Sequence, residues 1–155
     1  MYYRNHHNEN DPYDLQRFVN AQEGVYERAL SELQDGNKRT HWMWYIFPQI
    51  TGLGHSIASK RYAIKSREEA WAYLEHPVLG RRLKECAQVL LELRSNSAPD
   101  IFGYPDTFKL KSCMTLFEQV SGNFDSVFSQ VLEKYYDGER DKRTLKILER
   151  MEKEG

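Results

Sequence analysis

Residues 77–94, PVLGRRLKECAQVLLELR, carry the clearest indication of the fold class. Its apolar side chains recur every three or four residues, at Leu79, Leu83, Cys86, Ala87, Leu90 and Leu93. This spacing puts them on one face of an α-helix, whereas a strand would alternate every second residue. Small polar residues at 95–99 interrupt the pattern. We therefore predict a long amphipathic helix with one buried face.

Similar patterns on both sides of this stretch predict further helices. A serine three residues before a glutamate, Ser66 and Glu69, forms a capping box, and Gly36, Gly122 and Gly138 are suited to end helices. The predicted helices begin at or near Asp11, Ser66, Pro77, Asp106, Val127 and Asp141. The sequence thus predicts an all-α, single-domain bundle of about six helices over residues 11–155. Residues 1–10, which contain no apolar run, are expected to be a flexible tail.

The composition is that of a chain that folds on its own. Of 155 residues 40% are hydrophobic and 13% aromatic, which is more than disordered chains carry. No apolar run approaches the roughly 20 residues of a membrane span, and the N-terminus has no secretory signal, so we expect a cytoplasmic protein that does not enter a membrane. Cys86 and Cys113 are predicted to be reduced core residues. No metal-ligand spacing is present, and no cofactor is expected.

Charge is distributed unevenly, although the net charge is only -1. Residues 36–67 contain no acid and six bases, whereas the other 123 residues hold all 23 acids and 16 bases. The six bases are Lys38, Arg39, Lys60, Arg61, Lys65 and Arg67. This imbalance predicts a local positive potential that would attract an anionic ligand.

Residues 38–64 do not have the pattern of one regular helix. The run HWMWYIFP at 41–48 ends in proline, and TGLGHS at 51–56 contains two glycines. We expect a helical turn or short extended run followed by an ordered aromatic and glycine-containing loop. Backbone N–H groups in such a loop can hold phosphate oxygens, particularly if a helix begins near Ser56. The loop matches neither the P-loop nor the Rossmann fingerprint.

Ten residues in and near this segment are candidates for a ligand site. His41 could serve as a general base, because nearby positive charge favours a neutral imidazole. Aromatic rings near cations can stack a nucleobase and hold its phosphate. The predicted ligand-binding residues are Trp42, Trp44, Gln49, Gly52, Gly54, Ser56, Arg61, Lys109 and Ser112. Asp106, Lys109 and Ser112 would share one face at the start of a helix.

Each of these features also has a purely structural interpretation. The tryptophans would then be core residues, and the glycines would only permit a turn. His41 and His55 would donate to carbonyl groups within the fold, and Asp106 would be an N-cap. The spacing alone does not decide between the two interpretations.

Five stretches resemble a known family. DLQRFVNAQ (14–22), HWMWYIFPQ (41–49), GLG (52–54), YLEHPVLG (73–80) and KLKSCMTLF (109–117) are similar to domain-of-unknown-function family 1810, over about residues 13–149. The resemblance implies a small, all-helical, mainly microbial intracellular domain, and it brings no activity with it. Some members are labelled calpastatin. The aromatic core and helix caps of this chain argue against that label, because calpastatin is a disordered, proline- and lysine-rich chain.

Three functions remain open on this evidence. One is an enzyme or sensor that binds a phosphate-bearing small molecule, such as a nucleotide or an ADP-ribose-like compound. The others are a nucleic-acid accessory protein, which the overall pI of about 6.5 disfavours, and a protein-interaction module without chemistry. The oligomeric state is not encoded in any pattern of the sequence.

Overall fold

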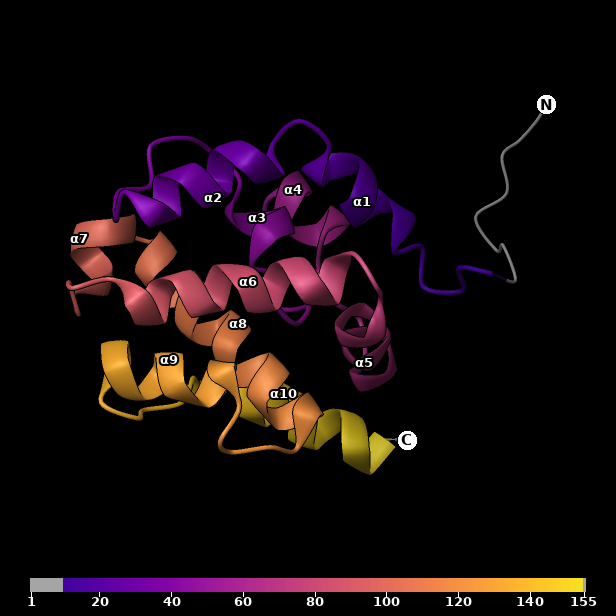
Figure 1. Cartoon of the computed structure of the whole chain (residues 1–155). Coiled ribbons are helices and arrows are strands. Elements are labelled where there is room, and N and C mark those ends of the chain that lie inside the picture. Colours follow the sequence, from indigo (N-terminus) through magenta and orange to yellow (C-terminus); the bar gives the residue numbers. More distant parts are fainter. Residues whose placement is uncertain (1–9, 155) are drawn as a thin grey trace.

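The computed structural model of the protein describes residues 10–154, and within them it contains ten helices (Figure 1). The predicted tail at 1–10 lies outside the described residues except for Asn10. The helices are α1 (Gln16–Gln22), α2 (Tyr26–Gln34), α3 (Met43–Ile46), α4 (Ile57–Arg61), α5 (Arg67–Glu75), α6 (Leu79–Glu92), α7 (Ala98–Phe102), α8 (Asp106–Ser121), α9 (Val127–Tyr136) and α10 (Lys142–Glu154). The described part has no strand, only one isolated parallel bridge between Ile50 and Ile64. The all-α prediction is confirmed.

The predicted number of about six helices is wrong, for local reasons. The first predicted helix is divided into α1 and α2 at Gly24, whose φ of 70° is left-handed and ends a helical run. Residues 38–64 contain two short helices, α3 and α4, with the Ile50–Ile64 bridge between the loop and the chain after α4. The fourth addition is α7, which Ser97 caps through its hydroxyl.

Three predicted helix starts had different outcomes. The Ser66 hydroxyl accepts from the Glu69 N–H at 3.0 Å, as the capping box requires. Asp141 caps α10 by accepting from the Thr144 N–H at 3.0 Å. The prediction that Asp106 caps α8 is wrong, because Pro105 is the N-cap residue and makes no side-chain cap. The Asp106 carboxylate instead binds two lysines, described below.

Two long helices, α6 and α8, organise the core. α6 contacts α2 on one side and α9 on the other, and it also packs against α5 (Figure 1). α8 contacts α5, α7, α9 and α10 and is buried around most of its circumference from Leu110 to Glu118. A helix enclosed in this way can carry polar side chains only where neighbours satisfy them.

Two buried charged side chains with saturated hydrogen bonds fix residues 38–64 against the bundle. The guanidinium of Arg17 on α1 donates to the carbonyls of Arg61 and Ala63 and to the Glu69 carboxylate. The buried carboxylate of Glu32 on α2 accepts from the N–H groups of residues 39 and 40, the Thr40 hydroxyl and the Trp42 indole. The chain therefore leaves α2 and returns to α5 at fixed positions.

Both cysteines are buried, and neither forms a disulfide, as the sequence predicted. The described helices do not include one that is long and apolar enough to cross a membrane.

Candidate functional site

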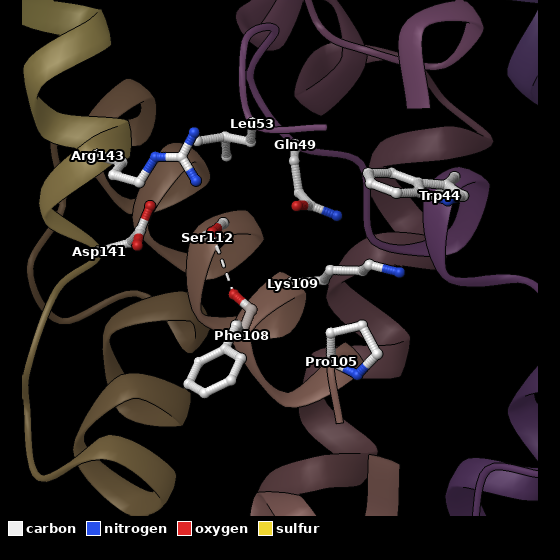
Figure 2. Close-up of a pocket in the computed structure, with 9 residues that line it drawn as sticks. All are labelled: Trp44, Gln49, Leu53, Pro105, Phe108, Lys109, Ser112, Asp141 and Arg143. Carbon is white, nitrogen blue, oxygen red and sulfur yellow. Dashed lines mark hydrogen bonds between the residues drawn. The ribbon is translucent and has the colours of Figure 1, made fainter. Parts of the chain in front are cut away.

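A pocket of about 390 Å³ lies where α3, the following loop, α8 and the start of α10 meet (Figure 2). Four of its nine lining residues are predicted ligand residues: Trp44, Gln49, Lys109 and Ser112. The others are Leu53, Pro105, Phe108, Asp141 and Arg143. We call this the Gln49 pocket.

Short-range geometry places the side chains of this pocket. On α8, Phe108, Lys109 and Ser112 fall within about one turn, so they share one end of the helix. Trp44 is held on the single turn of α3, which Pro48 prevents from continuing. The loop beyond it is fixed to α10, because the Arg143 guanidinium donates to the Gly52 carbonyl at 3.3 Å.

Gln49 is the most informative residue of the pocket. Its side chain is 4% exposed, and its amide nitrogen has no hydrogen-bond partner. Figure 2 shows that nitrogen directed toward the space between Trp44 and Lys109. A buried donor without a partner costs about 1–3 kcal/mol, and nearly all buried donors in folded proteins are paired. An acceptor on a bound molecule would satisfy it.

Lys109 belongs to an ion cluster in which positive charge exceeds negative charge. The Asp106 carboxylate binds Lys109 at 3.0 Å and Lys38 at 2.8 Å. Burial alone would raise the pKa of Asp106, but hydrogen bonds from Lys38 and Lys109 outweigh it and lower the pKa. The carboxylate is therefore ionised at neutral pH, and two cations share one anion. The excess charge favours an anionic ligand beside the cluster.

The same lysine lies over an aromatic ring. The Lys109 ammonium is 4.5 Å from the centre of the Trp44 ring, within the range of a cation–π interaction. Trp44 is partly exposed, whereas its neighbours Met43 and Ile46 are buried. One wall of the pocket thus joins a flat apolar surface and a cation.

Some polar groups on the opposite wall of the pocket already form hydrogen bonds within the protein. The Ser112 hydroxyl donates to the Phe108 carbonyl at 3.1 Å and keeps its lone pairs for another donor. One oxygen of Asp141 accepts from both the N–H and the hydroxyl of Thr144. Arg143 is exposed and adds a second cation. The wall therefore offers both donors and acceptors.

Two predicted site residues lie in an adjoining cavity. A space of about 190 Å³ is lined by His41 and Trp42, and Trp44 and Lys109 line it as well. Trp42 is 1% exposed and its indole N–H donates to Glu32, whereas the Trp44 residue lines both cavities. His41 is exposed, and its carbonyl accepts from the Tyr45 hydroxyl at 3.0 Å. His41 lines only this smaller cavity and Gln49 only the larger pocket, whereas Trp44 and Lys109 line both.

The remaining predicted residues do not line the Gln49 pocket. Arg61 lines a different cavity with Arg17 and Lys65. The Ser56 hydroxyl caps the short helix α4. The Gly54 backbone lies so close to Ser59 and Trp44 that a Cβ atom there would be 2.6 Å from Ser59 Cβ and 3.0 Å from the Trp44 ring. Gly52 has a φ of 97° and holds Arg143 through its carbonyl. The two glycines shape the loop that supplies Leu53.

The predicted positive potential of residues 36–67 is partly cancelled by acids from elsewhere. Lys38 pairs with Asp106 and Arg67 with Glu152, across large sequence separations. Arg39 pairs with Asp35 just before the segment. Among residues 10–154 no ion pair involves Lys60, Arg61 or Lys65. These acids therefore neutralise half of the six bases.

Sequence reasoning missed five lining residues of the Gln49 pocket. Pro105 and Phe108 lie in a stretch that the sequence had singled out for its polar residues only, and Leu53 is between two predicted glycines. Asp141 was recognised only as a helix start, and Arg143 not at all. No local pattern signals that α10 returns to residues 51–54.

The described residues contain no group of three or more His, Cys, Asp or Glu side chains that could hold a metal ion. The donors of the Gln49 pocket instead suit an organic ligand with several acceptors, since Gln49, Lys109 and Arg143 all carry N–H groups.

Similarity to known proteins covers almost the whole chain. A crystal structure of the conserved hypothetical protein Rv1873 from Mycobacterium tuberculosis, at 1.38 Å, is similar with 48% identity and a TM-score of 0.86. The match covers 89% of this chain and 98% of that one. No curated protein matches the chain. The sequence also matches, over residues 12–148, the family described as "Protein of unknown function (DUF1810)". The chain therefore belongs to this family.

Proposed function

We propose that the protein binds a phosphate-bearing small molecule, of the size of a nucleotide, in the Gln49 pocket. The observation that carries the proposal is the unpartnered, buried amide nitrogen of Gln49. A donor left unpaired in the unliganded protein gains a full hydrogen bond when a ligand supplies an acceptor. The cost of leaving it unpaired is understandable if the position serves binding rather than stability.

The remaining features of the pocket fit an anion attached to a flat group. Its volume of about 390 Å³ is within the range of about 300–1,000 Å³ for small-molecule sites, at the small end. Lys109 and Arg143 contribute two positive charges to its lining against one negative charge from Asp141. The partly exposed face of Trp44 offers a stacking surface, and base–aromatic stacking contributes about 1–3 kcal/mol.

The proposed function of the Gln49 pocket is binding, and it includes no catalytic role for His41. His41, the predicted general base, faces the adjoining 190 Å³ cavity and not the Gln49 pocket. A general base must come within about 3 Å of the proton it removes. Catalysis by His41 would therefore require a ligand that reaches beyond the Gln49 pocket.

A second candidate function, a protein-interaction module, rests on a different face. A cavity of about 610 Å³ is lined by residues of α5, α6 and α9, among them Trp71, which is 48% exposed. Exposed tryptophans are frequent in protein interfaces. The paired state of Lys38, Arg39 and Arg67, in contrast, weakens the case for a nucleic-acid backbone track.

Thermal unfolding with ligands tests the proposed pocket. Adenosine monophosphate or ADP-ribose at about 100 times its dissociation constant should stabilise the protein by roughly 2.7 kcal/mol, which raises the melting temperature by several degrees. Gln49→Leu and Lys109→Met should remove most of this increase. Both variants act on the lining of the pocket without removing a helix cap or a core side chain.

Arg61→Gln is the matched control. Arg61 is an exposed cation of the acid-free segment 36–67, which also contains Gln49, but it lines a different cavity. It should leave the ligand-induced increase unchanged. The proposal is wrong if no phosphate compound stabilises the wild type at millimolar concentration. It is also wrong if Arg61→Gln abolishes the effect while Lys109→Met does not.

A further inference from the structure

Two cavities of this protein have two lining residues in common, and we call this shared part of their lining the wall. The Gln49 pocket, of about 390 Å³, and the His41 cavity, of about 190 Å³, are both lined by Trp44 and Lys109. Trp44 is held on α3, between buried residues of the core. Lys109 is a long unbranched side chain on the first turns of α8. Of the two, the lysine is the part of the wall that can move.

The contacts of Lys109 are ones that it can leave at low cost. Its ammonium binds Asp106 at 3.0 Å and lies 4.5 Å from the Trp44 ring centre, and its side chain is 23% exposed. Partly exposed ion pairs contribute little net stability. No other hydrogen bond of this ammonium is present in the described residues.

Asp106 remains neutralised when Lys109 leaves. Lys38 binds the other oxygen of the Asp106 carboxylate at 2.8 Å, and its side chain is only 7% exposed. Lys38 is held in place by the Thr40 carbonyl at 2.7 Å and lies 5.1 Å from the Trp42 ring centre. Asp106 thus has a permanent, buried counter-ion and a second, exchangeable one.

We infer that Lys109 is an exchangeable divider between the two cavities, and that the ligand is a phosphodiester or diphosphate whose charged group binds Lys109 while organic groups fill both cavities. The inference rests on the proposed function and specifies its ligand class. An anion drawn to Lys109 competes with Asp106 for the ammonium. When Lys109 turns toward it, the wall opens and the Gln49 and His41 cavities become continuous.

The position of the charge selects the ligand class. Because a cavity lies on each side of Lys109, the anionic group must carry substituents on both sides to use the whole site. A terminal phosphate monoester has one organic substituent and would fill the Gln49 pocket alone. A diphosphate that links two groups, as in ADP-ribose, would reach both Gln49 and His41. The amide nitrogen of Gln49 is directed toward the space beside Lys109, where it can donate to the same charged group (Figure 2).

Calorimetric titration of the wild type with two probes provides the main test. ADP-ribose should bind at least about tenfold more tightly than adenosine monophosphate, because it makes contacts in a second cavity. Binding of ADP-ribose should shift the imidazole resonances of His41 in NMR spectra, and binding of adenosine monophosphate should leave them in place. Equal affinities together with an unmoved His41 would overturn the divider while leaving the proposed pocket intact.

Substitution of Asp106 supplies an independent test of exchange. Asp106→Asn removes the competitor for Lys109 and one nearby negative charge, so it should tighten ADP-ribose binding about fivefold. Lys109→Met should weaken that binding about tenfold or more. Weaker binding by Asp106→Asn would mean that Asp106 holds the ligand directly, which contradicts the exchange.

Folding of the Asp106 variant needs its own control, because Lys38 is buried beside it. The double variant Lys38→Met with Asp106→Asn removes both partners of that pair and leaves Lys109 in place, and it should also bind more tightly than Lys109→Met. If neither probe binds the wild type by calorimetry, the proposed function and this inference both fail. If both bind with the expected preference but the Asp106 variants bind no tighter, only the exchange is wrong.

Discussion

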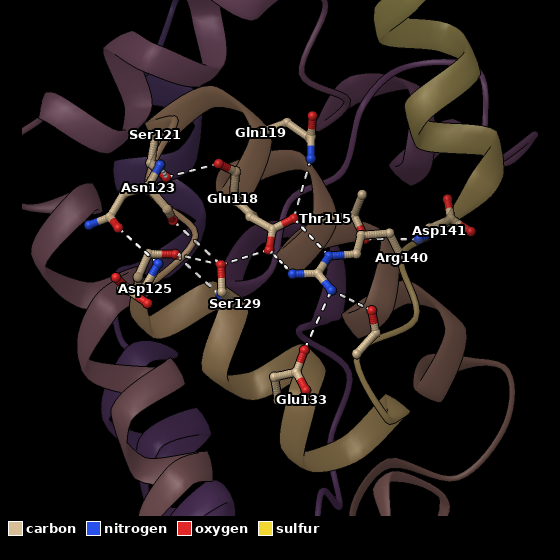
Figure 3. Close-up of polar contacts among 12 residues, drawn as sticks. Thr115, Glu118, Gln119, Ser121, Asn123, Asp125, Ser129, Glu133, Arg140 and Asp141 are labelled. Carbon is tan, nitrogen blue, oxygen red and sulfur yellow. Dashed lines mark hydrogen bonds and ion pairs between the residues drawn. The ribbon is translucent and has the colours of Figure 1, made fainter.

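The two ends of α8 each carry a polar cluster, and only one of the clusters is complete. Near the C-terminal end, Glu118 is fully buried and accepts from Arg140, Ser129 and Gln119 (Figure 3). Near the N-terminal end, the Gln49 pocket contains an unpartnered donor, and its Lys109 belongs to an ion cluster with two cations for one anion. A buried cluster that is saturated by its own neighbours serves the fold, whereas one that lacks partners has capacity for another molecule.

The Glu118 cluster shows what saturation looks like in this protein. Arg140 donates to Glu118 through Nε at 3.0 Å and also through Nη2, and the Ser129 hydroxyl donates at 2.6 Å. Burial alone would raise the pKa of Glu118, but these contacts outweigh it and lower the pKa. The cluster joins α8, α9 and the turn before α10 (Figure 3).

The two ends are also connected. The residue after Arg140 is Asp141, whose N–H donates to the Thr115 hydroxyl on α8 at 2.9 Å. Asp141 then caps α10 and lines the Gln49 pocket. The saturated cluster therefore fixes the rim of the unsaturated one, as a second layer of support does in many binding sites.

The largest expected effect comes from breaking the saturated cluster. Glu118→Leu leaves Arg140 and Ser129 without their buried acceptor, so we expect a loss of about 3–5 kcal/mol in the free energy of unfolding and roughly 10 °C in melting temperature. Urea and thermal unfolding measure both. Glu139→Gln is the matched control, because Glu139 pairs with Lys111 but is 67% exposed, and it should leave the free energy of unfolding nearly unchanged. Equal losses in the free energy of unfolding would contradict the view that the buried Glu118 cluster serves the fold and the exposed Glu139 pair does not.

A second saturated carboxylate gives a pH-dependent effect of intermediate size. Burial would raise the pKa of Glu32, but four hydrogen bonds outweigh it and lower the pKa from 4.5 to about 2. Its contribution to stability is therefore complete above about pH 4.5 and declines as the pH falls toward 2. Glu32→Gln should cost about 2 kcal/mol at pH 7. Urea unfolding between pH 6 and 3 should show this difference from the wild type narrowing, and a difference that stays constant would refute the assignment.

The smallest expected effect is a difference in the free energy of unfolding between variants of two buried glutamines. Gln22 is 2% exposed, and its amide donates to the Tyr45 carbonyl at 2.8 Å and accepts from Arg82 at 3.1 Å. Gln22→Leu should cost about 1–2 kcal/mol, since these partners lose their bonds. Gln49→Leu should leave the unliganded stability unchanged or raise it by up to about 1 kcal/mol, because it removes an unpaired buried donor. The comparison fails if Gln49→Leu destabilises the protein as much as Gln22→Leu.

The helical class and many helix ends could be predicted from the amino-acid sequence, because they depend on interactions within a few residues. The apolar spacing of residues 79–93 predicted the buried face of α6, and Ser66, Asp141 and Gly122 acted as cap residues where expected. The family resemblance, based on local motifs, was confirmed over residues 12–148. Four residues that line the candidate pocket, Trp44, Gln49, Lys109 and Ser112, were singled out because they lie in or near those motifs, and their role in binding stays a prediction.

Which charges remain unbalanced and which distant residues meet could be seen only in the folded arrangement of the helices. Asp106 lies 68 residues beyond Lys38, yet it neutralises that lysine, and Arg143 reaches the loop at Gly52 from the other end of the chain. The sequence could not separate Arg61 from Lys109, or Trp42 from Trp44, because exposure and pairing depend on packing between distant segments. The acid-free segment indicated where positive charge begins in the chain. The folded arrangement of acids around it determines where that charge is still available to a ligand.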